Sequence, residues 1–216
     1  MKLEREREQI TRYAQRLRPD GLVTGTSGNI SARSGDLVAM TPSGLDYDTM
    51  RPDLICVVNL DGELVEGELT PTSEISMHLA VYELTDAGAA VHNHSPYATV
   101  LSTLIDEIPP IHYLLAELGG PVRVAPYATF GTPELAENMG RALQGRHAAL
   151  LANHGTMSIG ETVEEAYSRS ITLEWLSELY YRARQFGEPR LLNMDEVERV
   201  IERMADYGQV APAEPG

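Results

Sequence analysis

Two hydrophobic periods divide this chain. From residue 3 to residue 17 the apolar side chains recur at the spacing of one helix face, at Leu3, Ile10, Tyr13, Ala14 and Leu17. Between residues 23 and 65 the apolar stretches are short and are separated by turn sequences such as Ser-Gly-Asn and Pro-Ser-Gly. The first segment predicts a helix, and the second predicts a meander of short strands with a hairpin turn at Asp61-Gly62.

From residue 70 onward, helical and strand-like segments alternate. Hydroxyl residues in 70–74 can cap a helix that is predicted to end before Gly88. The remaining pattern predicts strands at 89–94, 122–125 and 148–153, and helices at 97–104, 133–143, 163–186 and 195–206. This interleaving predicts one layered α/β domain over residues 1–208, followed by a disordered tail at 209–216.

Composition supports one domain without covalent cross-links. The chain has 216 residues, of which 43% are hydrophobic, and its single cysteine, Cys56, lies in an apolar run typical of a buried thiol. The N-terminus is charged and helical in pattern, and no stretch approaches the roughly 20 apolar residues of a membrane span. We therefore expect a soluble, cytoplasmic protein with no membrane partner.

Charge restricts the chemistry further. A net charge of −15 argues against nucleic acid as a partner, because affinity for its backbone comes from basic side chains. One small phosphorylated substrate remains compatible with that charge, since backbone N–H groups and hydroxyls can hold an anion locally. Lys2 is the only lysine and lies at a terminus, so a Schiff base is not expected, and carbonyl activation would need a metal or hydrogen bonds.

Three histidines are candidate metal ligands. His92 and His94 alternate along a predicted strand and so share one face, and His154 follows another apolar strand, from which a third imidazole would converge on the same ion. Imidazole ligands suit zinc and its neighbours in the transition series. We interpret His78, His112 and His147 as structural, although His78 is one helical turn from Glu74 and a supporting role there stays open.

Loops rich in hydroxyls and glycine predict an anion site. These are residues 26–31, which include Gly28 and Asn29, and residues 41–44, which include Ser43 and Gly44. Thr72 and Ser73 add hydroxyls at a predicted helix N-terminus, where the helix dipole favours negative charge. No nucleotide-binding glycine pattern is present, so these loops indicate a small phosphorylated ligand.

Several short motifs occur together in one order along the chain: Gly28-Asn29, Ser43-Gly44, Ser73-Glu74, His92-Asn-His94, Ile-His-Tyr113, the segment 125–131, and Asn153-His154-Gly155. On these motifs the chain resembles the class II, zinc-dependent aldolases of the aldolase/epimerase/adducin-head superfamily, and within it the branch acting on L-fuculose 1-phosphate. The resemblance implies a three-layer α/β/α fold around a largely antiparallel sheet. It also implies a homotetramer with active sites at subunit interfaces.

The resemblance also assigns roles to residues. It makes His92, His94 and His154 ligands of one Zn²⁺ per subunit, with Glu74 a fourth ligand that leaves the metal to act as acid/base. It places the substrate phosphate on a set of small and hydroxyl residues: Gly28, Asn29, Ser43, Gly44, Thr72 and Ser73. Tyr113 of a neighbouring subunit would handle the proton of the aldehyde oxygen, and Tyr207 would help to close the site.

The expected reaction is reversible cleavage of L-fuculose 1-phosphate or a related deoxy-ketose 1-phosphate. The products would be dihydroxyacetone phosphate and an aldehyde such as L-lactaldehyde, and a metal would stabilise the enediolate without a lysine. Alternatives within the superfamily are a 4-epimerase, in which aspartate would replace Glu74, and a dehydratase or decarboxylase. A non-catalytic interaction module like the adducin head is the alternative from another class, although the three histidines and Glu74 favour an enzyme.

Overall fold

The computed structural model describes residues 1–204. The predicted tail at 209–216 and the predicted site residue Tyr207 lie outside this range. The helices are α1 (Glu4–Leu17), α2 (Ile75–Leu84), α3 (Pro96–Ser102), α4 (Pro133–Leu143), α5 (Val163–Phe186) and α6 (Met194–Met204), with short 3-10 turns η1 (Tyr47–Thr49), η2 (Pro52–Leu54) and η3 (Tyr113–Leu118). None of these helices is both long and apolar enough to cross a membrane.

Within the described residues the strands form one nine-stranded sheet in the order β4-β3-β2-β1-β5-β9-β8-β7-β6. The strands are β1 (Asn29–Ser34), β2 (Leu37–Met40), β3 (Cys56–Asn59), β4 (Leu64–Glu66), β5 (Ala89–Asn93), β6 (Glu107–Ile108), β7 (Val122–Ala125), β8 (Ala148–Leu151) and β9 (Gly155–Gly160). In this part of the chain β7 and β8 pair in parallel, and the other neighbours pair antiparallel. The expected largely antiparallel sheet is therefore confirmed.

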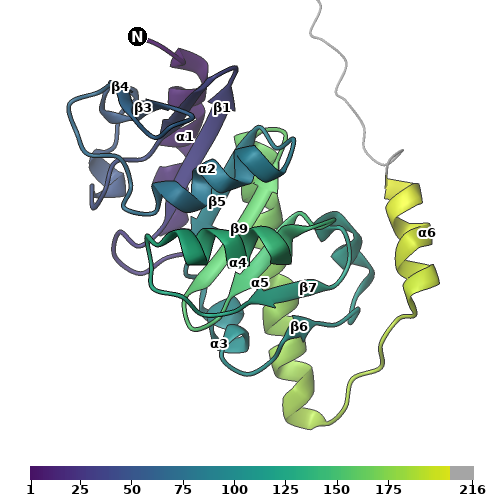
Figure 1. Ribbon diagram of the computed structural model, residues 1–216. Helices are drawn as coiled ribbons and strands as arrows, with labels where there is room; N and C mark the ends of the chain where they lie inside the picture. The colour runs from purple at the N-terminus through teal and green to yellow at the C-terminus, as the bar shows by residue number, and fades with distance from the viewer. Residues whose placement is uncertain (205–216) are drawn as a thin grey trace, which may run out of the picture.

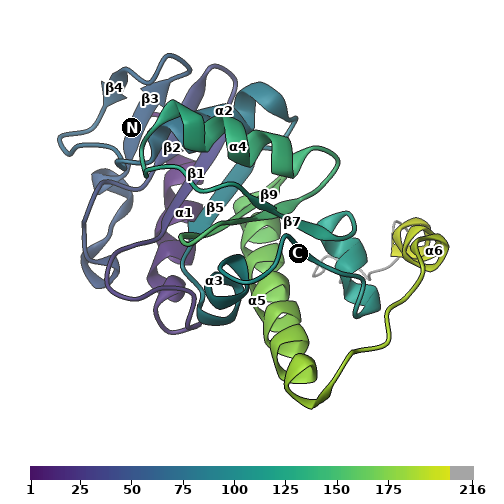
Figure 2. The same ribbon diagram turned by 60° about the horizontal axis from the view of Figure 1, so that its bottom comes forward.

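Helices cover both faces of the sheet (Figures 1 and 2). On one face α2 and α4 bury their apolar sides, including Met77 and Met139, against the strands. On the other face α1 and α5 pack through Ile10 and Tyr167, and α3 extends that layer. A fully buried aliphatic side chain contributes about 1.5–3 kcal/mol, so these two interfaces hold the three layers together. The expected α/β/α arrangement is confirmed.

The order of the central strands brings distant residues to one end of the sheet. On β1, Asn29 pairs with His92 of β5, and β5 in turn pairs with β9. The turn between β8 and β9 holds Asn153, in the left-handed backbone region with φ 55°, and His154. We expected His154 to converge from a neighbouring strand. In the structure β9, which the sequence did not predict, lies between β5 and β8.

Candidate active site

Three imidazoles converge where β5 ends and β9 begins. The Nε2 atoms of His92 and His94 are 3.0 Å apart, and each pair of rings among His92, His94 and His154 has its centroids 4.9 Å apart. One ligand atom from each of the three residues lies within 4.8 Å of the other two. The residues singled out by spacing along the chain are therefore close enough to bind one ion.

The backbone fixes how these rings face the centre. The Nδ1 atom of His92 lies 2.7 Å from the carbonyl oxygen of Thr156, to which it donates, so Nε2 is the nitrogen that faces the centre of the site. Gly155 leaves room for His94, since a Cβ there would lie 2.7 Å from the His94 Cδ2 atom and 2.4 Å from the Asn93 oxygen. The β8–β9 turn therefore depends on a residue without a side chain at position 155.

Glu74 faces the histidines from the position directly before α2. Its carboxylate oxygens lie 3.1 Å from the Nε2 atoms of His92 and His154, and Asn29 Nδ2 donates to Oε2 at 2.8 Å. Burial alone would raise the pKa of Glu74, but His92, His154 and Asn29 outweigh it and hold the pKa well below its usual range. The group is therefore a carboxylate at neutral pH.

This donor set fits a divalent metal. The Glu74 Oε1 atom is buried and accepts no hydrogen bond from the residues that the structure describes. Burial, together with the neighbouring imidazoles of His92 and His154, lowers the pKa of His94 to about 4, so the His94 ring is neutral and its lone pair is available at pH 7. Neutral imidazoles beside a free carboxylate oxygen are the ligands that zinc and its neighbours bind.

The hydroxyl loops and the metal centre share one cavity of about 420 Å³. Among its lining residues are all six that were assigned to the phosphate: Gly28, Asn29, Ser43, Gly44, Thr72 and Ser73. Glu74, His94 and His154 line the same space. The Gly28 N–H donates to the Tyr47 hydroxyl at 2.8 Å, so Gly28 contributes close backbone approach while its N–H is already bonded. The residues predicted to bind the phosphate therefore line the same cavity as three of the predicted metal ligands.

Two aromatic residues at this cavity were not assigned a role from sequence. Tyr127 and Phe130 line it although they are 61% and 64% exposed, so each presents a ring at the cavity and to solvent. The sequence signal was the pair of large aromatics in the loop at 126–131, between β7 and α4. These two rings add apolar surface to the lining of the cavity.

Tyr113 lies elsewhere in the structure. It begins η3, is 50% exposed, and packs its ring 4.5 Å from that of His112. It is not among the residues that line the cavity. Within one described chain, therefore, the structure brings together the predicted metal and phosphate residues and leaves Tyr113 on a separate surface.

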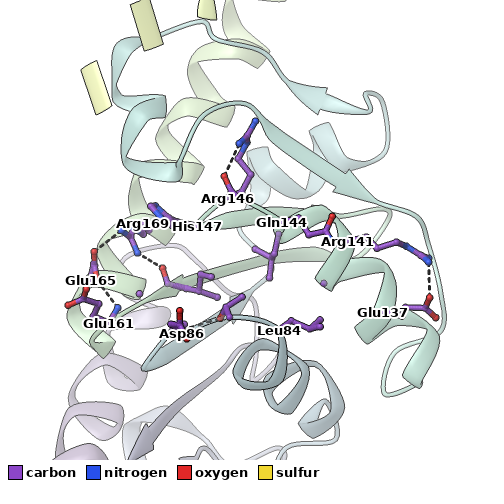
Figure 3. A pocket seen from close by; sticks show the side chains of 17 residues that line it. Leu84, Asp86, Glu137, Arg141, Gln144, Arg146, His147, Glu161, Glu165 and Arg169 are labelled. Atoms are coloured by element: carbon purple, nitrogen blue, oxygen red, sulfur yellow. Dashed lines mark hydrogen bonds and ion pairs between the residues drawn. The ribbon is translucent and has the colours of Figure 1, made fainter. Parts of the chain in front are cut away.

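A second, larger cavity of about 610 Å³ lies at the far end of β9 (Figure 3). Its charged side chains bond mostly to one another or to the backbone: Arg141 pairs with Glu137 at 2.8 Å, and Arg169 pairs with Glu165 at 2.6 Å. The metal-binding cluster found among residues 1–204 lies in the smaller cavity. Size therefore does not identify the reactive site.

The fold and the site define a known class. A family model described as the class II aldolase and adducin N-terminal domain matches residues 8–181, and the chain belongs to this family. It is 42% identical to a 5-deoxy-D-ribulose 1-phosphate aldolase from Bacillus thuringiensis, and the alignment covers 97% of this chain and 100% of that relative. It is 39% identical over 87% of its length to 88% of an L-fuculose phosphate aldolase from Escherichia coli.

Solved structures agree with these relatives. A structure of an L-fuculose 1-phosphate aldolase matches 93% of this chain and 96% of its own, with a TM-score of 0.91 and 39% identity. The chain is therefore a class II aldolase, a carbon–carbon lyase for a ketose 1-phosphate that is close to L-fuculose-1-phosphate aldolase. The relatives named as aldolases therefore favour the enzyme over the non-catalytic interaction module, whose domain belongs to the same family.

Proposed function

We propose that this aldolase cleaves a deoxy-ketose 1-phosphate whose far end is a methyl group, reversibly giving dihydroxyacetone phosphate and a short aldehyde. The observation that carries this proposal is the shared cavity, which is lined by the predicted phosphate loops, by His94 and His154, and by the exposed aromatic residues Tyr127 and Phe130. The faces of aromatic rings offer an apolar surface on which a methyl group can pack.

Among such substrates we place 5-deoxyribulose 1-phosphate first and L-fuculose 1-phosphate second. The relative named for 5-deoxyribulose 1-phosphate aligns over its whole length at 42% identity. A relative from Rhodospirillum rubrum, 43% identical over 88% of this chain and 87% of its own, is named for 5-methylthioribulose 1-phosphate and 5-deoxyribulose 1-phosphate. Each of these ketoses would leave an aldehyde with an apolar end.

For the chemistry, we propose that His92, His94 and His154 hold one divalent metal, with zinc favoured, and that Glu74 is a fourth ligand in the resting state. When bound, the metal would polarise the ketose carbonyl and stabilise the charge of the enediolate. Gly28, Asn29, Ser43, Gly44, Thr72 and Ser73 would anchor the phosphate. In the synthetic direction Glu74 takes the proton from C3 of dihydroxyacetone phosphate, and that carbon bonds to the aldehyde carbon.

The aldehyde oxygen then needs a proton, and we propose that Tyr113 of a neighbouring copy supplies it. A phenol with an ordinary pKa of about 10 is a suitable donor. The half-exposed ring of Tyr113 and the exposed rings of Tyr127 and Phe130 would both be covered in an assembly with a shared site. We therefore propose a homotetramer with one site between each pair of adjacent copies.

The decisive assay is retro-aldol cleavage of the 1-phosphates of 5-deoxyribulose, fuculose, rhamnulose and ribulose, measuring dihydroxyacetone phosphate with and without chelator. We expect 5-deoxyribulose 1-phosphate to give the highest kcat/KM, chelator to abolish cleavage, and added Zn²⁺ to restore it. Glu74→Gln would serve as the inactive control that keeps the histidines. If ribulose 1-phosphate were the best substrate, the proposed methyl preference would be wrong.

Mixing two inactive variants tests the shared site. Glu74→Gln and Tyr113→Phe each disable a different side of it, so a mixture that is dissociated and reassembled would contain some sites with both native residues. Random assembly makes about a quarter of the sites fully native. Recovered activity near that share would support Tyr113 acting between copies, and none after confirmed mixing would contradict it.

A further inference from the structure

A row of buried side chains runs from α2 through β1 and ends on Glu74. The Tyr82 hydroxyl is 2.6 Å from Ser31 Oγ, and Ser31 Oγ is 2.7 Å from His78 Nδ1. The His78 Nε2 atom lies 2.5 Å from Asn29 Oδ1, and Asn29 Nδ2 lies 2.8 Å from Glu74 Oε2. Four hydrogen bonds therefore connect a tyrosine far from the cavity to the proposed acid/base.

The two secondary structures present these groups at matching intervals. Asn29 and Ser31 are two residues apart on β1, so both point to the same face of the sheet. His78 and Tyr82 are four residues apart on α2, so they share a helix face one turn apart. The polar groups of the helix and the strand thus alternate along the row, and Glu74 directly precedes the same helix.

Chemistry sets the direction of every bond. The Glu74 carboxylate can only accept, so the Asn29 amide must turn its NH₂ toward it and its Oδ1 toward His78. His78 must then carry its proton on Nε2, which leaves Nδ1 to accept from the Ser31 hydroxyl. Ser31, having donated its proton, accepts from Tyr82. All four donors therefore point toward the carboxylate.

Burial excludes other hydrogen-bonding partners for the residues of this row. The five residues are between 0% and 6% exposed, so water does not replace a missing partner. Burial also lowers the pKa of His78 to about 3, which keeps its ring neutral with one donor and one acceptor nitrogen at physiological pH. A neutral imidazole with its proton on Nε2 is the one form that completes the row in the required direction.

From this geometry we infer that His78 is a positioning residue: by holding the Asn29 amide in one orientation, it fixes the Glu74 carboxylate between the imidazoles and the substrate. Asn29 also lines the phosphate pocket, so the same bond aligns the phosphate anchor with the proton-transfer group. The kinetic part of this inference rests on the proposed function, whereas the tautomer and the amide orientation do not.

The first test is independent of activity. Nitrogen-15 NMR of the chelator-treated protein distinguishes the two neutral tautomers of a histidine ring, and we expect His78 to be neutral at pH 7 with its proton on Nε2. A His78 ring protonated on Nδ1 would overturn the inference. Because this readout needs neither metal nor substrate, it holds even if the proposed substrate is wrong.

The second test asks whether His78 acts through Asn29. We expect His78→Phe to lower kcat about 10- to 100-fold, the usual cost of losing a partner behind a reactive group, with bound zinc retained. We expect Asn29→Ala to cause a larger loss, and the double variant to be no worse than Asn29→Ala alone. His78→Gln keeps a donor for Asn29 and should recover part of the loss.

The rate of proton exchange distinguishes a positioning role of His78 from a merely structural one. Exchange of the C3 proton of dihydroxyacetone phosphate with deuterated water reports Glu74 without any aldehyde, and it should fall in His78→Phe in step with kcat. If the kcat losses of His78→Phe and Asn29→Ala multiplied in the double variant, the inference would be overturned. An unchanged exchange rate in His78→Phe would also overturn it. A wild-type protein that cleaves none of the ketose phosphates would instead contradict the proposed function.

Matched variants outside the row separate its effect from general destabilisation. Ser177 is buried on α5 and donates to the Leu173 oxygen, so Ser177→Ala matches Ser31→Ala. The Tyr167 hydroxyl is bonded to Asp20, so Tyr167→Phe matches Tyr82→Phe. We expect kcat to fall about three- to tenfold for Ser31→Ala and less for Tyr82→Phe, with little change in the controls. Equal losses within either pair would count against the inference.

Discussion

The two cavities at opposite ends of β9 differ in what their polar groups are free to do. At the larger one the charged groups mostly bond to each other, as in the pairs Arg141–Glu137 and Arg169–Glu165. At the smaller one the histidines face one another, and Glu74 keeps a buried oxygen without a hydrogen bond from residues 1–204. The comparison shows that the reactive cavity is marked by lone pairs that accept no hydrogen bond within the protein. The volume of a cavity does not identify it.

The largest expected effect removes a lone pair from the smaller cavity. His94→Ala should lose bound metal and lower kcat/KM at least about a thousandfold, because the metal supplies several kcal/mol of charge stabilisation in the transition state. Elemental analysis and the release of dihydroxyacetone phosphate measure the two losses. His147→Ala, at the larger cavity, is the matched control and should keep both metal and activity.

An intermediate effect concerns stability against pH and the buried imidazole of His78. Its pKa falls from an ordinary 6.5 to about 3 in the fold, so between these values the unfolded chain binds a proton that the folded chain does not. Stability is therefore lost as pH falls. From pH 7 to pH 5 this one group should cost about 2 kcal/mol.

Urea unfolding of chelator-treated protein at the two pH values measures this loss. His78→Phe has no such proton to bind, so its stability should fall by about 2 kcal/mol less than that of the wild type over the same interval. Equal losses in the two proteins would show that His78 does not titrate as its burial requires.

The smallest expected effect is at the larger cavity. Arg141 is well exposed and its ion pair with Glu137 is on the surface of α4, where such pairs contribute little. Arg141→Ala should therefore leave kcat/KM for the preferred ketose phosphate within about twofold of the wild type. A tenfold or greater loss would mean that the two ends of β9 are coupled, and the contrast drawn between the cavities would fail.

The metal centre could be anticipated from sequence because its geometry is local. The predicted strand at 89–94 places His92 and His94 on one face by alternation, and their Nε2 atoms do lie 3.0 Å apart, although β5 itself ends at Asn93. The position of His154 could be known only from the tertiary structure. His154 directly precedes β9, which pairs with β5, and the segment Gly155–Gly160 was not predicted as a strand. That segment is short, begins and ends with glycine, and contains small polar residues, which makes it resemble a loop.

The row behind Glu74 could not be predicted from spacing. Asn29 and Glu74 are 45 positions apart, and Asn29 and His78 are 49 apart, so neither contact leaves a periodic signal. Sequence alone placed Asn29 only in the phosphate site, and it left a supporting role for His78 open. In the structure His78 is completely buried, as a structural histidine would be, and its ring nitrogens bond to Asn29 and Ser31.

The position of β9 has a consequence for how the chain is made. It is the last strand in the described sequence, yet it inserts in the middle of the sheet, between β5 and β8. During synthesis, β5, which carries His92 and leads into His94, therefore lacks its β9 neighbour until Gly155–Gly160 has emerged from the ribosome. The predicted metal ligands can therefore come together only after β9 has been made, and a chain interrupted before residue 155 would expose the unpaired edge of β5 to other chains.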